Sequence, residues 1–202
     1  MSGPTADSGS PNEATMAAKA ALRSRMTERR RRAAAAAPAA AETVRDRAIA
    51  DLDFPPDALV SAYWPLRDEL DPRPLMLALA AQGRRLCLPV VEASGAPLVF
   101  RAWHPGDPLA EACFGTQIPY DTAPVVVPDM LLIPLLAFDG HGYRLGYGGG
   151  FYDRTLADLR RVKAITAVGL AYAGQQVEDL PIEATDRRLD ALVTERAVLR
   201  FG

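Results

Sequence analysis

The sequence predicts an α/β fold, an open and mostly parallel sheet with helices on both faces, preceded by an N-terminal pair of helices. Three observations support this prediction. Apolar runs of strand length alternate with segments of helical spacing from residue 58 onward. The first part of the chain is instead rich in alanine and arginine, which favour helix. The chain has 202 residues, 49% of them hydrophobic, which is enough for one substantial core and short for two.

The N-terminal region is predicted to contain a tail and two helices. Residues 1–15, MSGPTADSGSPNEAT, are mostly small or polar, so they bury too little apolar surface to offset the entropy of ordering and are expected to be disordered. A helix is predicted from Ala14 to about Ala37, where Pro38 stops it and opens a second helix that reaches about Asp53. Residues 16–202 are expected to form a single domain.

The rest of the chain supplies the sheet and its covering helices. Strands are predicted over Ala58–Trp64, Arg85–Val91, Leu98–Trp103, Met130–Leu136, Lys163–Leu170, Ala191–Thr194 and Ala197–Arg200. Helices are predicted over Pro72–Gln82, ended by Gly83, and over Gly150–Arg161. Ligands on such sheets gather at the carboxyl ends of the strands, so the segments that follow Trp64 and Leu136 are expected to contribute to a site.

Composition excludes several classes of function. The net charge of −2 predicts no polyanionic partner, and no segment approaches the roughly 20 apolar residues of a membrane span. Cys87 and Cys113 have neither metal-ligand spacing nor a disulfide framework, which fits a reducing cytoplasm and two buried thiols. We therefore expect a cytoplasmic protein that binds neither nucleic acid nor a membrane.

The basic residues of the first helix allow a nucleic-acid interpretation, because only Glu28 opposes seven lysines and arginines between residues 16 and 32. Four consecutive arginines, residues 29–32, spread around all sides of a helix, however, and no aromatic residues interleave with them for base stacking. A solvated helical surface is the better interpretation. Lys19 and Arg23 are the exception, since their spacing puts both on one face, where they could hold a phosphate together.

A glycine-rich loop is the strongest chemical signal in the chain. The segment RLGYGGGFYDRTL, from Arg144 to Leu156, follows an apolar strand and leads into a helix. Its four glycines allow close approach of the backbone to a ligand, and the N–H groups of the loop together with the helix N-terminus favour an anion such as phosphate. Asp153 lies about one turn into that helix, near enough to offer an oxygen to magnesium. A plain glycine-rich turn, with Asp153 compensating the helix dipole, is the alternative.

Spacing excludes two familiar phosphate loops. A Walker A loop needs Gly-Lys followed by Ser or Thr, and a dinucleotide-binding loop needs a glycine where Phe151 stands. His104 and His141 have no partner pattern for metal binding or nucleophilic catalysis, and no Gly-x-Ser-x-Gly elbow occurs.

The longer run PLLAFDGHGYRLGYGGGFYDR resembles the signature of the 5-formyltetrahydrofolate cyclo-ligases, also called methenyltetrahydrofolate synthetases. Weaker resemblances occur in the family's order at Lys19–Arg23, at Tyr63-Trp64-Pro65 with Glu69, at Gly115–Pro119, and at Asp186 with Asp190. The chain departs from the family at Gly149, where many members have Lys, and at Tyr147, where some have Arg. These departures leave more of the phosphate charge to Arg144, Lys19 and Arg23.

The resemblance implies an enzyme that uses ATP and magnesium to convert 5-formyltetrahydrofolate to 5,10-methenyltetrahydrofolate with release of ADP and phosphate. It implies catalytic roles for Arg144, Tyr152 and Asp153, and magnesium binding by Asp153 and Asp186, with Asp190 as the alternative second acid. ATP is expected to bind Lys19, Arg23, Arg144, Leu145, Gly146, Tyr147, Gly148, Gly149, Gly150, Phe151 and Tyr152. The folate is expected to bind Trp64, Glu69, Tyr147, Gly148, Gly149 and Gly150, because a donor-rich pterin suits a carboxylate and an aromatic surface.

Two other classes stay open at this stage. The Rossmann-like sheet pattern also resembles sugar-phosphate isomerases and CoA transferases, so an enzyme that acts on a phosphosugar or a CoA ester without ATP is one alternative. A non-catalytic nucleotide or RNA binder is the other, which the acidic net charge disfavours. We expect the protein to be a monomer.

Overall fold

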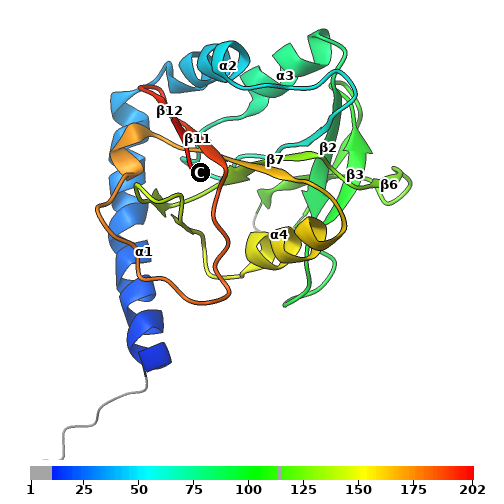
Figure 1. Ribbon diagram of the computed structural model, residues 1–202. Coiled ribbons are helices and arrows are strands. Elements are labelled where there is room, and N and C mark those ends of the chain that lie inside the picture. The colour runs from blue at the N-terminus through cyan, green and yellow to red at the C-terminus, as the bar shows by residue number, and fades with distance from the viewer. Residues whose placement is uncertain (1–10, 113–114) are drawn as a thin grey trace, which may run out of the picture.

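The computed structural model describes residues 11–112 and 115–202, and an eight-stranded sheet lies at its centre (Figure 1). The strand order is β12-β11-β10-β7-β1-β2-β3-β6. The bounds are β1 Leu59–Ser61, β2 Arg85–Val90, β3 Val99–Trp103, β6 Val125–Val126, β7 Met130–Pro134, β10 Thr166–Leu170, β11 Ala191–Val193 and β12 Val198–Arg200. The pairs between β11, β10, β7, β1 and β2 are all parallel, whereas β12, β3 and β6 add antiparallel pairs at the two edges. The predicted open, mostly parallel sheet is confirmed.

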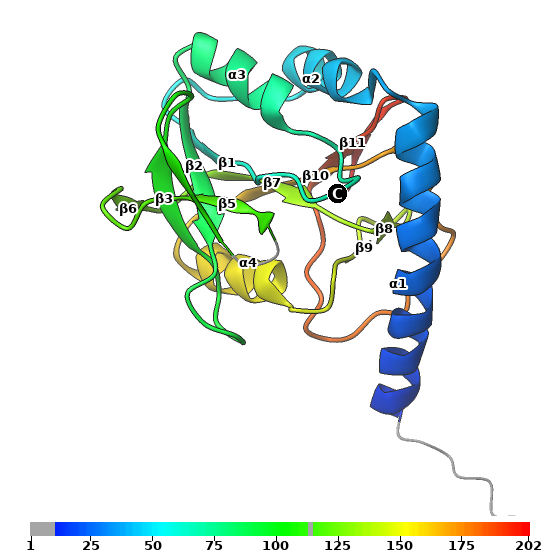
Figure 2. The same ribbon diagram turned by 180° about the vertical axis from the view of Figure 1, so that it is seen from behind.

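Helices cover both faces of this sheet, as the sequence predicts. Figures 1 and 2 show α2 (Ala40–Asp51) and α3 (Arg73–Ala81) together on one side and α4 (Phe151–Val162) on the other. The central strand β7 serves both cores because alternate side chains point to opposite faces: Leu132 joins the core under α2 and α3, and Leu131 and Ile133 join the core under α4. All three of these side chains are fully buried.

Helix α1 (Pro11–Ala36) stands beside the carboxyl ends of the parallel strands rather than on either face (Figure 2). It packs next to the 3₁₀ turn η2 (Ala173–Gln175), which follows β10, and next to the small sheet of β8 (Ala137–Phe138) and β9 (Arg144–Leu145). Four residues at spacings of three and four form its buried face: Lys19, Leu22, Met26 and Arg30. Two basic residues therefore point from this helix toward the carboxyl edge.

The helix begins earlier than the sequence predicts. Residues 11–15 were assigned to the disordered tail but are helical, because Pro11 is compatible with a first helical turn and Glu13 complements the positive end of the dipole. The rest of the predicted tail, residues 1–10, lies outside the described residues, as does Cys113, whereas Cys87 is buried as expected.

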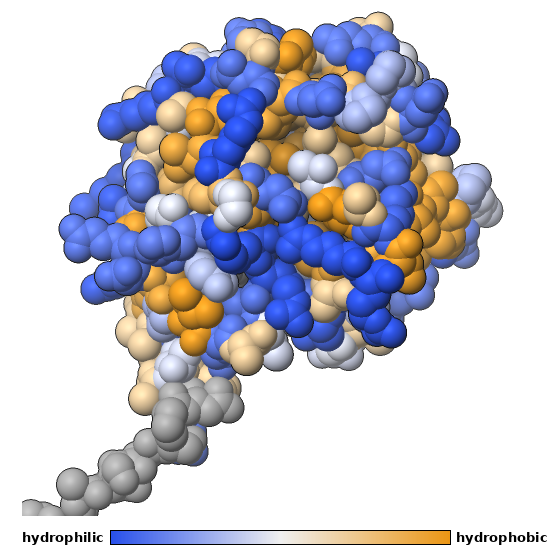
Figure 3. Space-filling model, viewed as in Figure 1, coloured by the Kyte–Doolittle hydropathy of each residue, from blue (hydrophilic) through white to orange (hydrophobic). Residues whose placement is uncertain are grey.

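Each predicted strand and helix is present, with ends that move by a few residues. The short strands β4 (Leu109–Glu111), β5 (Gln117–Pro119), β6, β8 and β9 were not predicted, because two or three residues produce no readable alternation. Among the described residues, no helix is long and apolar enough to cross a membrane. On the face seen in Figure 3, hydrophobic side chains form small patches between hydrophilic ones.

Candidate active site

The glycine loop, residues 146–150, connects β9 to α4 at the carboxyl edge of the sheet. Gly148 and Gly150 have φ values of 102° and 64°, a region that residues with a side chain rarely adopt. Gly150 is the N-cap of α4, so the first N–H groups of the helix face the loop. Gly146 and Gly149 have ordinary φ angles. The strand, loop and helix predicted from the sequence are confirmed, and two of the four glycines are required by backbone shape.

Arg144 and Asp153 form an ion pair beneath this loop. The Arg144 side chain is only 4% exposed, and its Nη2 donates to Asp153 Oδ1 at 2.9 Å. Its Nη1 donates to the carbonyl of Arg187, whose own N–H donates to the same Asp153 oxygen at 3.0 Å. No group in the described part of the chain hydrogen-bonds to Asp153 Oδ2. The site thus has a fixed guanidinium beside a carboxylate with one oxygen left for a ligand.

Lys19 and Arg23 reach the site from α1 but have different partners. Lys19 Nζ lies 2.6 Å from Glu183 Oε2 and 2.7 Å from Asp186 Oδ2. Burial disfavours the Lys19 ammonium, but the two carboxylates outweigh burial and raise the Lys19 pKa above its ordinary value. Arg23 Nε donates to the carbonyl of Gly146 at 3.0 Å. Arg23 therefore contacts the loop directly, whereas the charge of Lys19 is already balanced by two acids.

Glu69 lies on the other side of the loop in a buried polar cluster. Only 6% of Glu69 is exposed, and its two oxygens accept hydrogen bonds from the Tyr147 hydroxyl at 2.7 Å and the Leu66 N–H at 2.8 Å. Burial raises the Glu69 pKa, while these two donors and the charge of Arg30 act to lower it. Tyr147, itself 51% exposed, thus joins the glycine loop to Glu69.

Arg30 is a member of this buried cluster that was not predicted from the sequence, because it was grouped with its neighbours on the solvated surface of the helix. That interpretation is wrong for Arg30, which is 2% exposed, and right for Arg25, Arg29, Arg31 and Arg32, which are exposed. Arg30 Nε donates to Asp68 Oδ2 at 3.0 Å, and its Nη1 donates to the Tyr147 hydroxyl. The signal was present in the sequence: Arg30 follows Met26 by four residues on the same helical face as Lys19.

Trp64 does not join this cluster. Its ring meets Trp103 edge to face at a centroid distance of 6.2 Å, and the Arg73 guanidinium lies 5.5 Å from its centroid. Tyr152 lies in the first turn of α4, where it packs against the core and burial raises its pKa. The remaining predicted ATP ligands flank the loop: Leu145 is buried and Phe151 lies beneath the Arg154 guanidinium.

The acidic residues offer few metal ligands. Within the described residues, no three His, Cys, Asp or Glu side chains gather as a metal site. Asp186 has both oxygens within 3.0 Å of Lys19 Nζ. Asp190 has other partners, since its Oδ2 accepts hydrogen bonds from Arg160 and from the Ala167 N–H. Asp153 is therefore the acid whose oxygen is best placed for a cation.

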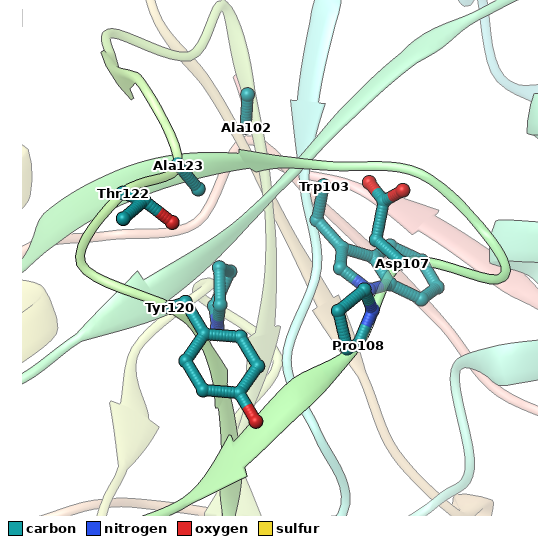
Figure 4. Close-up of a pocket in the computed structure, with 8 residues that line it drawn as sticks. Ala102, Trp103, Asp107, Pro108, Tyr120, Thr122 and Ala123 are labelled. Carbon is teal, nitrogen blue, oxygen red and sulfur yellow. The ribbon is translucent and has the colours of Figure 1, made fainter.

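Two cavities lie apart from the predicted site residues. One, of about 160 Å³, has Trp103, Asp107 and Pro108 on one side and Tyr120, Thr122 and Ala123 on the other (Figure 4). A larger one, of about 690 Å³, lies beside the starts of β1 and β2, at the opposite edge from the loop. None of the site residues predicted from the sequence lines either cavity.

The doubly covered parallel sheet, with a glycine loop and basic side chains at its carboxyl edge, is typical of α/β enzymes that bind phosphate groups. The family comparison narrows this class. Residues 15–195 match the 5-formyltetrahydrofolate cyclo-ligase family, and the chain belongs to that family.

Individual relatives agree with this assignment. The chain is 38% identical over 155 residues to the 5-formyltetrahydrofolate cyclo-ligase of Escherichia coli (strain K12), a match that covers 73% of this chain and 85% of that protein. It is 33% identical over 147 residues to the cyclo-ligase of Mycolicibacterium smegmatis, covering 68% and 73%. The structure of the Aquifex aeolicus 5,10-methenyltetrahydrofolate synthetase aligns with a TM-score of 0.72 at 33% identity, over 90% of this chain and 92% of that one. The family resemblance proposed from the sequence is confirmed.

Proposed function

We propose that this protein converts 5-formyltetrahydrofolate to 5,10-methenyltetrahydrofolate, using ATP and magnesium and releasing ADP and phosphate. Family membership supports the reaction. The single observation that supports this chain's own site is the hydrogen bond from Tyr147 to Glu69, because it joins the phosphate loop to the carboxylate suited to a pterin. The two substrates must meet at such a junction. We further propose that the protein acts as a cytoplasmic monomer.

The nucleotide half of the site consists of the glycine loop and its basic neighbours. N–H groups of residues 146–150 and the N-terminus of α4 would bind the phosphates. Arg144 is fixed by Asp153, so it would present its charge without further ordering, and Arg23 already lies against the loop. Lys19 would add its charge to the phosphates while Asp186 and Glu183 keep it ammonium. Leu145, Phe151 and Tyr152 would line the nucleotide.

The residues fit a magnesium ion through Asp153. Its free Oδ2 is the hard oxygen ligand that magnesium prefers, and the other ligands would come from phosphate and water. Asp186 would join directly or through water. Magnesium would neutralise charge on the phosphates during transfer. Asp153 also holds Arg144, so one residue would orient two positive groups.

The folate half centres on Glu69. The pterin ring presents adjacent N–H donors, and a carboxylate can accept two of them. Tyr147 now donates to one Glu69 oxygen, so the ring would replace that hydroxyl. Tyr152 would line the reacting end. The Arg73 guanidinium lies against the Trp64 ring, so Trp64 would contact the pterin only if Arg73 moved away. We therefore assign Trp64 a smaller contribution to folate binding than Glu69.

The reaction asks the protein mainly for positioning. The formyl oxygen attacks the terminal phosphorus of ATP, and ADP leaves. The resulting imidoyl phosphate carries an activated carbon. The second folate nitrogen attacks this carbon and closes the ring, the nitrogen loses its proton, and departure of phosphate leaves the methenyl product. Such a transfer needs charge stabilisation and alignment rather than a protein nucleophile. The site offers these in Arg144, Arg23, Lys19 and the loop.

The test is direct. Purified protein with 5-formyltetrahydrofolate, ATP and magnesium should produce the absorbance of methenyltetrahydrofolate together with one ADP per turnover. ADP should not form when the folate lacks its formyl group. Turnover of a phosphosugar or CoA ester, with no folate-dependent ADP, would refute the proposal.

A further inference from the structure

We propose that Arg30 is a positioning residue of the folate subsite, which holds Glu69 as a charged acceptor and fixes the direction of the Tyr147 hydroxyl. This inference rests on the proposed role of Glu69. It gives a role in the site to Arg30, which lies on α1, far from the glycine loop in the sequence.

The first argument is the cost of burying Arg30. A guanidinium that is 98% buried loses most of its hydration, which is unfavourable unless charged and polar partners replace the water. Asp68 supplies one partner at 3.0 Å, and Glu69 Oε1 lies 3.8 Å from Arg30 Nη1. Its neighbours Arg29 and Arg31 are exposed on the same helix, so burial is specific to Arg30. Its contacts point to Glu69 and Tyr147.

The second argument is the direction of the hydrogen bonds. Arginine can only donate, so Arg30 occupies an acceptor position of the Tyr147 oxygen. The hydroxyl proton is then directed to Glu69 Oε1. The chain from Arg30 through Tyr147 to Glu69 therefore favours the ionised carboxylate at its end. When the pterin displaces the hydroxyl from Glu69, Arg30 can retain it.

The third argument concerns the charges that face Glu69. Asp68 from its own loop, Tyr63 after β1, and Tyr152 from α4 face it together with Tyr147. Asp68 disfavours a second negative charge, and neither of the buried phenols is positively charged. Arg30 is the cation that acts to lower the Glu69 pKa, and its Nη1 lies 3.8 Å from Glu69 Oε1. Burial raises the Glu69 pKa, and loss of Arg30 would raise it further.

The experiment measures 5-formyltetrahydrofolate binding by calorimetry as a function of pH, without ATP, for the parent, Arg30→Gln and Arg30→Lys. Arg29→Gln, one residue away and exposed, is the matched control. Affinity should fall below the Glu69 pKa. In Arg30→Gln this fall should begin at least about one pH unit higher, so that at pH values below the parent's fall the variant should bind about tenfold more weakly than the parent. Arg30→Lys should keep the parent's pH dependence more closely because it keeps the charge, and Arg29→Gln should match the parent.

Arg30→Gln with uniformly weaker binding and an unshifted pH dependence would reduce Arg30 to a structural residue and overturn the proposal. If Arg30→Gln does not fold, Tyr147→Phe replaces it: removal of the donor should also move the fall to higher pH, and an unmoved fall would count against the proposal. Glu69→Gln separates the two levels of inference. If Glu69→Gln binds the folate as tightly as the parent, the folate role of Glu69 itself is refuted. If Glu69→Gln binds weakly but the Arg30 variants keep the parent's pH dependence, only the role of Arg30 is refuted.

Discussion

Substitutions along the glycine loop can show which glycines are needed for their backbone conformation and which only for the space that a side chain would fill. Gly148→Ala requires a side chain at φ 102°, which we expect to cost about 1–3 kcal/mol, and its Cβ would lie 3.3 Å from Arg23 Cζ. Gly150→Ala requires the left-handed region at φ 64°, at about 1–2 kcal/mol, and would move the Arg154 side chain. Gly149 has an ordinary φ, but its Cβ would lie 2.6 Å from Phe151 Cε2, so the ring must turn aside. A loop that relaxes out of this strained conformation must recover it to bind ATP, and each 1.4 kcal/mol is about tenfold in affinity, so the strain sets an upper limit of roughly 150-fold weaker ATP binding for Gly148→Ala.

Calorimetric ATP titration of the alanine variants and of Gly149→Lys tests this order, with thermal denaturation to confirm that each folds. We expect the largest loss at Gly148, a smaller loss at Gly150, and the least at Gly149. Gly149→Lys should stay active because its backbone φ is open to a residue with a side chain, and the added cation should strengthen ATP binding once the Phe151 ring has moved. Near-parent affinity of Gly148→Ala and Gly150→Ala beside a non-binding Gly149→Lys would refute the assignment of backbone roles.

Three further predictions concern single groups. Asp153→Asn keeps an acceptor for Arg144 but offers a poorer metal ligand, so it should fold and need about 10- to 100-fold more magnesium; parent-like magnesium dependence would remove Asp153 from the metal site. Lys19→Ala combined with Arg23→Ala should raise the ATP KM by at least tenfold, since each charge-assisted contact is worth about 1.5–3 kcal/mol; unchanged rates at low ATP would make both residues structural. Burial raises the pKa of Cys87 to about 12, so at pH 8 only about one molecule in ten thousand carries the thiolate. Peptide mapping after alkylation should find Cys87 unmodified until the protein is unfolded, and rapid labelling of native protein would contradict its burial.

The sheet could be predicted because its central strands are long apolar runs whose pattern is local. β7, buried on both faces, is the clearest case. The small sheet of β8 and β9 could not be predicted, since it exists only because the turn after Phe138 brings Arg144 back beside it. Its residues become strands through pairing rather than through their own preference.

The parts of the site that could be predicted are likewise those whose residues lie close together in the sequence. Arg144 and Asp153 lie nine residues apart on either side of the glycine loop, so the sequence motif contains both partners of this ion pair. The partners of Lys19 lie more than 160 residues away, and no spacing rule connects them. Arg30 was missed for a different reason, because counting four consecutive arginines concealed that one of them lies on the buried helical face.

Helix α1 makes the stability of the N-terminal region depend on site occupancy. Its links to the domain include Lys19 to Asp186, Arg23 to Gly146 and Arg30 to Asp68, all at the carboxyl edge. If the helix opened away from the domain, all three basic side chains would leave together, and the apparent affinity for ATP would fall with the fraction of molecules in which the helix is docked. Conversely, a bound nucleotide selects the docked form. The amide protons of α1 should then exchange with solvent more slowly as ATP is added, which makes this helix a reporter of ligand binding in the absence of turnover.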